Sequence, residues 1–337
     1  LGKQVNLLKV ILIHNFYGSS APSGENTVFD AEFALLRKSG HEIVPFTRHS
    51  DDIIQQGIFG QIKGALIAPW NPLTKSSLER MVLESKPDII HVHNTFPIIS
   101  PSIFHVENTS AAFVLTLHNY RCFCAAAIPM RNGTPCTLCL DAKNSWPALK
   151  YGCYRSSRLA TVPMVFMIEL HRKLKTWEER IDAFIALTDF QKRMLVQAGL
   201  PEHKVYIKPH FYSGNPGLVP WENRKNRIVF IGRLGEEKGI FDLVKAWELW
   251  GEDAPVLEII GDGDLKPGLE KFIKKNNLNH KVILRGLLPF EKTQAILSSS
   301  MLLVLPSVCF EGFPMTIREA FAHGVPVAAS DIGSIPD

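Results

Sequence analysis

Two glutamates, Glu311 and Glu319, stand close together in the sequence after a strongly apolar run. The run, residues 301–305, is typical of a buried strand, and the residues after it predict a helix that ends near Gly324. Glu311 would precede this helix and Glu319 would lie well inside it, so at ~1.5 Å of rise per residue they would stand ~10 Å apart. The acid and the nucleophile of a retaining glycosidase stand only ~5.5 Å apart. We therefore expect the two carboxylates to have separate roles.

The residues between the two glutamates predict an anion site. Gly312 lets the backbone approach a ligand closely, and Pro314 suits the first helical turn, where its missing N–H costs nothing. The amides of that turn, with the helix dipole behind them, attract negative charge. Taken alone, two glutamates at this spacing are also common on a solvated helix, so both interpretations stay open at this point.

The same stretch carries a family resemblance. From Pro306 to Glu319 the chain contains Pro-Ser, then Glu-Gly-Phe-Pro, then a second glutamate. This resembles the Glu-x7-Glu signature of family 4, the retaining nucleotide-sugar glycosyltransferases with the GT-B fold. The resemblance implies that Glu319 binds the ribose diol and that Glu311 is a catalytic residue facing the transferred sugar. It also implies three residues beside the sugar hydroxyls or the β-phosphate: Gly312, Phe313 and Pro314.

Two cations stand in a second motif, Gly-Arg-Leu-Gly-Glu-Glu-Lys-Gly at residues 232–239. It follows a predicted strand at 227–231 and matches the Gly-Arg-Leu…Glu-Lys-Gly of the family's second domain. Arg233 can bind phosphate oxygens through its planar fork, and Lys238 adds a compact charge at the start of a predicted helix. The pair would hold a nucleoside-diphosphate sugar and stabilise the departing diphosphate. A solvated surface turn is the alternative, which the adjacent glutamates would also suit.

Two further turns of the second half are expected to contact the donor. Gly261 lies in an Ile-Gly-Asp-Gly turn that ends a predicted strand and resembles a family motif; glycine there serves turn geometry first and donor contact second. Arg285-Gly-Leu-Leu ends the next strand, and the resemblance places the nucleotide base against this loop. Leu287 and Leu288 would form an apolar wall there.

The first half contributes a glycine turn and a histidine. Ser23-Gly24-Glu25-Asn26 precedes a predicted helix and resembles the family's Gly-Gly-Glu-Asp turn, with serine in place of the first glycine. Gly24 is therefore a candidate donor-binding residue. His118 ends a predicted strand at 113–118 and matches the active-site histidine of the family, expected near the transferred sugar. A strand-end histidine is otherwise more often a packed core residue.

A histidine pair ends another predicted strand at 87–93. His91 and His93 alternate along it and share one face of the sheet. Packing accounts for His91, while His93 stays a candidate for the site. His14, at the end of the first predicted strand, also falls at this edge.

Five of the six cysteines cluster between Cys122 and Cys153. Four of them resemble a pattern in one branch of family 4 and would hold a structural zinc ion in a tetrahedral site: Cys124, Cys136, Cys139 and Cys153. Free buried thiols explain the cluster equally well, and disulfides would be unusual for a cytoplasmic chain.

The 337 residues suffice for two domains. Strands and helices alternate as in doubly wound parallel sheets, and a Pro-, Gly- and Asn-rich linker near residue 212 separates the two series. We expect a GT-B α/β fold: an N-terminal acceptor domain at 1–212, with a Cys-rich insertion at about 120–157, and a C-terminal donor domain at 213–337. Their strand edges would face each other across a cleft. The end at Gly333–Asp337 falls within the family's Gly-x-Pro-Glu segment, so we expect a truncated C-terminal domain.

Composition limits the partners. A net charge of +4 is too small to indicate nucleic acid binding, and no apolar stretch is long enough to cross a membrane. We expect a cytoplasmic protein. Residues 159–177 predict one helix with a basic end, which either complements the helix dipole or rests on the inner face of the membrane, where lipid-linked acceptors reside.

The predicted function is transfer of a sugar from a nucleoside-diphosphate sugar to a hydroxyl of a glycan or lipid-linked acceptor, with retention of configuration. The sequence contains no evident carboxylate site for a divalent cation, so no catalytic cofactor is expected. A nucleotide-sugar epimerase of the same fold and a non-catalytic, zinc-stapled binding module are the alternatives.

Overall fold

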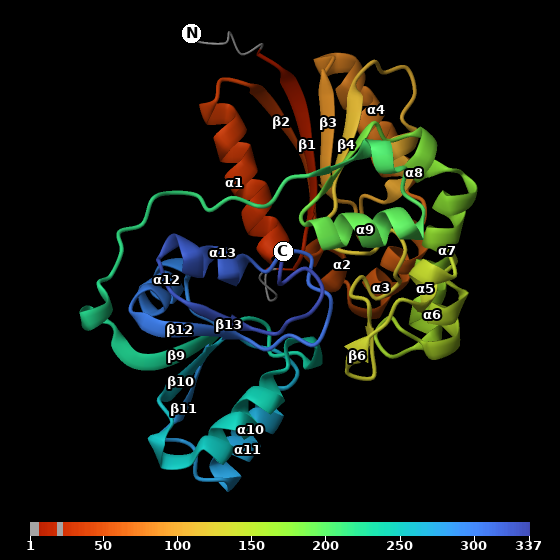
Figure 1. Cartoon of the computed structure of the whole chain (residues 1–337). Helices are drawn as coiled ribbons and strands as arrows, with labels where there is room; N and C mark the ends of the chain where they lie inside the picture. The colour runs from red at the N-terminus through yellow and green to blue at the C-terminus, as the bar shows by residue number, and fades with distance from the viewer. Residues whose placement is uncertain (1–6, 19–22) are drawn as a thin grey trace. The chain divides into compact units, whose positions relative to one another are not determined.

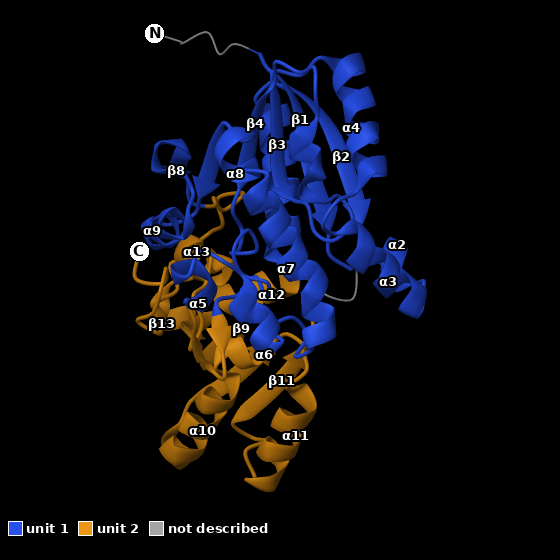
Figure 2. Ribbon diagram, turned by 90° about the vertical axis from the view of Figure 1, so that its right-hand side faces the viewer, with its two compact units in different colours: residues 1–129, 137–209 blue, residues 130–136, 210–337 orange. Residues whose placement is uncertain are grey.

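The computed structural model describes residues 7–18 and 23–337, which belong to two compact units (Figure 2). Unit 1 comprises residues 1–129 and 137–209, and unit 2 comprises residues 130–136 and 210–337. The sequence places the boundary after residue 212. In the structure the chain passes from unit 1 to unit 2 after Pro209, and a short piece of the cysteine-rich insertion groups with unit 2.

Unit 1 is built on a six-stranded parallel sheet in the order β2-β1-β3-β4-β7-β8 (Figure 1). The side chains from Val10 to Asn15 are all buried, which suits a central strand covered on both faces. The strands of unit 1 are β1 (Lys9–Phe16), β2 (Glu42–His49), β3 (Ile89–Asn94), β4 (Ala112–Thr116), β7 (Ala183–Ala186) and β8 (Val205–Ile207).

Helices connect these strands, and a helical insertion follows β4. The first group is α1 (Gly24–Lys38), α2 (Asp51–Ile54), α3 (Gly57–Ile67), α4 (Pro72–Ser85) and the 3-10 helix η1 (Pro101–His105). The second group is α5 (Leu138–Asp141), α6 (Trp146–Tyr151), α7 (Arg158–Lys173), α8 (Thr176–Glu179), α9 (Asp189–Ala198) and η2 (Glu202–Lys204).

Unit 2 has a five-stranded parallel sheet in the order β11-β10-β9-β12-β13. Its strands are β9 (Lys225–Ile231), β10 (Val256–Ile260), β11 (Val282–Gly286), β12 (Ser300–Leu305) and β13 (Val327–Ala329). The short antiparallel pair β5 (Met130–Arg131) and β6 (Thr134–Pro135) also groups with this unit. The helices are η3 (Trp221–Asn223), η4 (Glu236–Lys238), α10 (Ile240–Trp250), η5 (Gly251–Asp253), α11 (Lys266–Lys275), α12 (Phe290–Ser298) and α13 (Met315–Ala322).

Alternation along β9 divides the core of unit 2 into two layers. Ile228 and Phe230 pack with α10 and α11 on one face of the sheet. Val229 packs on the other face with Leu297 of α12 and Ala320 of α13. This period of two residues is what a strand buried on both faces requires, and it positions the loops after β9 and β12 at one edge of the sheet.

One predicted helix differs in the structure. The helix expected over 159–177 is broken, because Lys175 adopts a left-handed conformation (φ 50°) between α7 and α8. Pro163 lies inside α7. In the described part of the chain, no helix is both long and apolar enough to span a bilayer.

Candidate functional site

In unit 2 a largely buried ion pair joins the two charged motifs of the sequence. Lys238 Nζ lies 2.6 Å from Glu311 Oε1, and the two side chains are 19% and 12% exposed. The hydroxyl of Ser307 donates to the same carboxylate oxygen at 2.6 Å. Lys238 ends η4 after β9, whereas Glu311 lies between β12 and α13. The cation of one motif and the carboxylate of the other therefore meet at one point.

Arg233 lies on the same loop as Lys238 and pairs with Glu237. Its Nε and Nη2 atoms are 2.9 and 2.6 Å from Glu237 Oε1. The backbone of Glu237 also holds the segment that leads to Glu311, because the Val308 N–H donates to the Glu237 carbonyl at 3.0 Å. The Arg233 side chain is 62% exposed and that of Glu237 is 11% exposed, so the guanidinium has an open side from which it can reach a phosphate while it stays paired with Glu237.

Glycines allow main-chain segments to touch at this edge of the sheet. A Cβ atom at Gly239 would overlap the Pro306 carbonyl, and one at Gly261 would overlap the Gly232 carbonyl. The Gly232 N–H in turn donates to the Ile260 carbonyl at 3.0 Å. Gly261 is thus required by the contact between two strand-end loops, which agrees with the expectation that turn geometry comes first. Its contact with a donor stays a prediction.

Gly261→Ala is expected to destabilise unit 2 by about 2–4 kcal/mol, because the methyl group would force the two loops apart at a positive φ of 146°. Urea unfolding measures the effect. Gly217→Ala is the matched control, since a Cβ there meets open space, and Gly286→Ala isolates the cost of a positive φ of 67° without an overlap. Equal stability of all three variants would contradict the packing argument.

Glu319 lies in α13 and is held by a polar network. Gln294 Nε2 donates to Glu319 Oε2 at 2.8 Å. The Gln294 carbonyl oxygen is 3.0 Å from His323 Nε2 and 3.3 Å from the Tyr212 hydroxyl. Burial raises the pKa of the Glu319 carboxyl, and the hydrogen bond from Gln294 opposes that shift. The side chain thus has a fixed orientation, which is what recognition of a diol requires.

The three residues between the glutamates form the entry to α13. Pro314 is the N-cap residue and Met315 begins the helix. The Phe313 ring packs edge to face on His210, with centroids 5.4 Å apart. Gly312 follows Glu311 in the bend before the helix. The helix start and the position of Glu319 inside it agree with the sequence pattern.

The loop after β11 has one exposed leucine. Leu287 is 53% exposed, whereas Leu288 packs against the core layer that contains Val229. Arg285 donates two hydrogen bonds to Glu258, at 3.1 and 3.0 Å. The two-leucine wall predicted from the sequence is therefore reduced to Leu287.

In unit 1 the loop after β4 brings His118 against His93 of β3. His118 Nε2 is 3.0 Å from His93 Nδ1, and the rings stack with centroids 5.2 Å apart. One of the two nitrogens must donate, so the contact fixes complementary tautomers. The nitrogens of His91 instead contact Glu32 at 3.3 Å and Thr116 at 2.8 Å. His91 is thus held by two polar contacts, and His93 is the partner of His118.

The Gly24 turn is linked to the His118 loop by a contact that the sequence did not reveal. Gly24 is the first residue of α1, and Ser23 is its N-cap, with a hydroxyl that accepts from the Glu25 N–H at 3.3 Å. The serine that departs from the family turn thus caps the helix. Asn119 Nδ2 donates to Glu25 Oε1 at 2.8 Å. In the sequence, the only signal for this contact was the amide side chain of Asn119, directly after His118. Burial raises the pKa of the Glu25 carboxyl.

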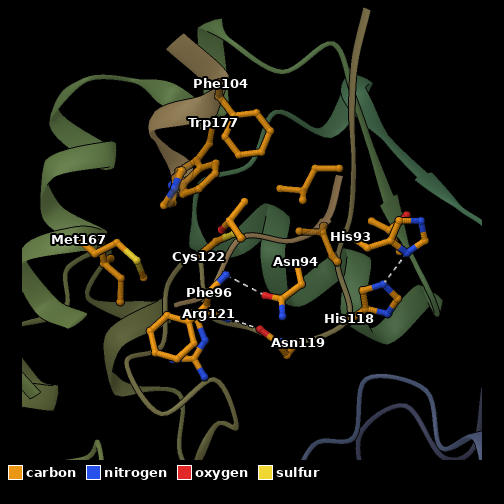
Figure 3. Close-up of a pocket in the computed structure, with 16 residues that line it drawn as sticks. His93, Asn94, Phe96, Phe104, His118, Asn119, Arg121, Cys122, Met167 and Trp177 are labelled. Carbon is orange, nitrogen blue, oxygen red and sulfur yellow. Dashed lines mark hydrogen bonds between the residues drawn. The ribbon is translucent and has the colours of Figure 1, made fainter. Parts of the chain in front are cut away.

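A small cavity of about 60 Å³ opens beside His118, with room for a few water molecules (Figure 3). Arg121 lies next to it, with its guanidinium carbon 4.0 Å from the centroid of the Phe96 ring. Met167 and Ile168 of α7 line the cavity from another side. Cation–π packing fixes Arg121 near the histidine pair.

His14 is fully buried at the end of β1 and lies in the same unit. Its Nε2 is 2.9 Å from Asn26 Oδ1, and burial lowers its pKa to about 4. Its ring stacks on Phe29, with centroids 4.9 Å apart. His14 is therefore neutral at neutral pH and supports the start of α1.

The structure brings only some of the clustered cysteines close to one another. Among the described residues, no cysteine forms a disulfide. Burial raises the pKa of Cys124 to about 12, and Cys139 and Cys153 are near enough to add to this shift. Cys139 and Cys153 also belong to the apolar cluster beneath α7. Cys136 falls in the segment that groups with unit 2.

The structure contains a different set of clustered ligand atoms. Atoms that could bind a metal ion are His nitrogens, Cys sulfurs and carboxylate oxygens. Over residues 7–18 and 23–337, only Glu32, His91 and His93 bring three of them within 4.8 Å of one another. Glu32 is already paired with Lys208 at 3.0 Å. Although burial acts in the opposite direction, contacts with His91 and Lys208 lower the Glu32 pKa to about 2. The zinc site on Cys124, Cys136, Cys139 and Cys153 stays a prediction, which elemental analysis would test.

A comparison with known families decides the identity of the chain. The sequence profile of "Glycosyltransferase Family 4" matches residues 24–212, more than half of the chain. The chain belongs to glycosyltransferase family 4. The profile of "Glycosyl transferases group 1" matches residues 219–337. The protein is thus a glycosyltransferase, as its motifs predict.

Curated relatives of this family 4 chain include glycosyltransferases named for teichuronic acid and amylovoran biosynthesis. TuaC of Bacillus subtilis (strain 168), named as a candidate teichuronic acid biosynthesis glycosyltransferase, is 26% identical over 97% of this chain and 82% of its own length. The amylovoran biosynthesis glycosyltransferase AmsK of Erwinia amylovora is 33% identical over 46% of this chain and 41% of its own length.

Solved structures confirm the GT-B fold of this family 4 chain. A glycosyltransferase from Rickettsia africae ESF-5 superposes with a TM-score of 0.63 at 16% identity, over 98% of this chain and 80% of the other. Anabaena HepE, solved in complex with UDP and glucose, has a TM-score of 0.58 at 15% identity, over 97% and 82% of the two chains. At these identities the likeness concerns the fold alone.

Proposed function

We propose that this glycosyltransferase transfers a sugar from a nucleoside-diphosphate sugar, with UDP as the nucleoside diphosphate, to a hydroxyl of a glycan or lipid-linked acceptor with retention of configuration. Unit 2 would bind the donor, and unit 1 would bind the acceptor and contribute His118. The UDP complex of HepE and the polysaccharide assignments of TuaC and AmsK support this choice of substrates.

The contact of Lys238 with Glu311 carries the proposal. It joins, at 2.6 Å, the two motifs that would bind opposite ends of one ligand, the diphosphate and the sugar. A diphosphate that reaches Lys238 is then next to the carboxylate that would bind the sugar hydroxyls. Arg233, mostly exposed on the same loop, would bind the remaining phosphate oxygens.

In this proposal the protein's own cations stabilise the leaving diphosphate. An ammonium and a guanidinium aimed at the oxygens where charge develops supply the electrostatic stabilisation that the departing group needs. No metal ion would be required for catalysis. Retention would follow attack of the acceptor hydroxyl on the face from which the diphosphate departs, with the leaving phosphate taking the proton.

Binding of the donor tests the proposal before any acceptor is known. A screen by thermal shift against common nucleotide sugars is expected to raise the melting temperature with at least one UDP sugar, because a ligand that binds only the native state stabilises it. Product analysis with and without acceptor then separates transfer from epimerisation, and the anomeric configuration of the product tests retention. No stabilisation by any nucleotide sugar would count against the donor site.

Glu319→Gln is expected to weaken binding of the nucleotide sugar about 10- to 100-fold, because an amide cannot accept two hydrogen bonds from a ribose diol as a carboxylate does. Burial raises the pKa of Glu319, so the ionised form is lost as the pH falls through that raised value. Affinity of the parent should therefore fall on acidification and that of Glu319→Gln should not. Calorimetric titration with an intact nucleotide sugar, whose phosphodiesters stay ionised, measures both. Glu248→Gln, on the exposed surface of α10, is the control.

A further inference from the structure

Helices α3 and α7 of unit 1 are neighbours, and each leaves large apolar side chains in water. On α3 these are Ile58, Phe59, Ile62 and Leu66; on α7 they are Leu159, Val162 and Phe166. We call these seven residues the α3–α7 surface. Phe59 is 78% exposed and Leu159 84%. Seven large apolar side chains exposed on two neighbouring helices exceed the scattered single residues of an ordinary surface, which favours an interaction site.

The sequence of α3 explains why its apolar side is exposed. Gly60 and Gly64 face α2, and a Cβ atom at Gly60 would overlap the Ile53 carbonyl. The helix thus packs through its glycines, which leaves its large side chains on the other side. On α7 the exposed residues recur at intervals of three and four, and the buried side packs on the cysteine-rich insertion.

The charged residues near the α3–α7 surface indicate which kind of partner it binds. From Ile53 to Thr74 and from Ala142 to Ile168 the chain contains no acidic residue. The charged residues of these segments are Lys63, Lys143, Lys150, Arg155 and Arg158, and all are exposed. In the part of the chain that the structure describes, none of them forms an ion pair with a carboxylate.

Four carboxylates border these segments: Asp51 and Asp52 on α2, Asp141 on α5 and Glu169 on α7. In the described part of the chain, none of them forms an ion pair with one of the five cations. Glu169 accepts hydrogen bonds from the backbone and hydroxyl of Ser145, both at 2.6 Å. Asp141 accepts from Thr137 and Gln197. Five exposed cations without an ion pair among the described residues would oppose pairing of two copies of this surface, because like charges would meet across the two-fold axis.

We propose that the α3–α7 surface docks on a lipid bilayer that contains anionic lipids. Its apolar side chains would enter the boundary between headgroups and acyl chains, while the five cations would meet lipid phosphates. Trp146 and Tyr151, exposed on the adjacent helix α6, are of the residue types that gather at membrane interfaces.

In the basic end of α7, which suggested a membrane contact in the sequence, Lys173 is exposed, but His171 and Arg172 are held by contacts within unit 1. His171 is fully buried, and its Nδ1 and Nε2 contact Thr176 and the Pro69 carbonyl, both at 2.9 Å. Burial lowers its pKa to about 4. Arg172 packs over the Phe123 ring at 5.4 Å. The membrane contact is therefore inferred from the middle and the start of α7.

Helix α7 also links the surface to the cavity beside His118. Phe166 is exposed, whereas the next two residues, Met167 and Ile168, line the cavity. A bilayer against α7 would thus be separated from the cavity by the thickness of one helix, ~10 Å. This arrangement would suit a lipid-linked acceptor. The choice of acceptor rests on the proposed function, whereas docking on the membrane is independent of it.

Vesicle sedimentation tests the proposal with the full chain. We expect binding to phosphatidylcholine vesicles that contain phosphatidylglycerol, weaker binding to phosphatidylcholine alone, and loss of binding as salt is raised. Phe59→Ser combined with Phe166→Ser should weaken binding about tenfold or more. Arg155→Glu combined with Arg158→Glu should weaken it about tenfold on anionic vesicles only.

Leu249→Ser is the matched control, because Leu249 is 88% exposed on α10 beside acidic residues. It should leave vesicle binding unchanged. All substituted side chains are exposed, so melting temperatures and stabilisation by nucleotide sugar should match the parent, which separates this test from that of the donor site. Absence of vesicle binding, or equal binding by the surface variants, would overturn the proposal. So would a homodimer, measured by light scattering, that the same variants disperse.

Discussion

Lys238→Met is expected to lower kcat/KM for the nucleotide sugar about 100- to 1,000-fold, the range for losing one preorganised group that stabilises developing charge. Methionine keeps much of the apolar stem and removes the ammonium, so no cation remains at the position that contacts Glu311. Binding of UDP should weaken as well, because the ground state also carries the diphosphate. Steady-state hydrolysis of the bound nucleotide sugar and calorimetric titration with UDP measure the two effects.

The stability of the Lys238 variant must be separated from its activity. Removing the ammonium leaves the Glu311 carboxylate largely buried with Ser307 as a remaining donor, which should cost about 1–3 kcal/mol. Adding Glu311→Gln should recover most of that stability, since no buried charge is left, but not the activity. Lys245→Met changes an exposed pair on α10 and should have no effect on either property. If the double variant recovered both, the lysine would be structural.

His118→Ala is the second large effect we expect, with kcat reduced about 100-fold or more and UDP affinity unchanged. The proposed contact of His118 is with the transferred sugar rather than with the nucleotide, and a hydrogen bond used mainly in the transition state lowers kcat when removed. Hydrolysis kinetics at saturating nucleotide sugar, together with UDP titration, distinguish the two contributions. A loss of UDP affinity equal to the loss of kcat would contradict this assignment.

His93 provides the companion test. Its Nδ1 lies 3.0 Å from His118 Nε2, so His93→Ala should leave His118 less well oriented and lower kcat about tenfold. Asparagine can present a polar atom near the position of Nδ1, and His93→Asn should therefore recover part of the activity. A purely structural role would instead lower the melting temperature of both variants alike.

Much of the fold follows from local sequence patterns. Apolar runs such as 227–231 and 301–305 became β9 and β12 because a parallel strand buried on both faces needs an uninterrupted apolar sequence. Helix α3 was not predicted, since its glycines and exposed apolar residues give no clear division into an apolar and a polar face. The break at Lys175 was also missed, because a single left-handed residue leaves little trace in periodicity.

The candidate site, too, could be predicted only in part from the sequence. Resemblance to the family's motifs indicated Lys238, Glu319 and His118, and for Lys238 the chemistry of phosphate binding pointed the same way. Their supporting partners were not predictable: Gln294 reaches Glu319 from another helix, and Asn119 reaches Glu25 across 94 positions of sequence. Such contacts depend on how strands are ordered in the sheet, which no local pattern records.

The glycine contacts at Gly239 and Gly261 set a practical limit on redesigning the enzyme. Part of the wall around the proposed phosphate site is bare backbone in van der Waals contact with bare backbone. Substitutions there would remodel the loops rather than enlarge a pocket. A change of nucleotide preference would have to be engineered through a side chain that projects into solvent, with Leu287 the first position to randomise.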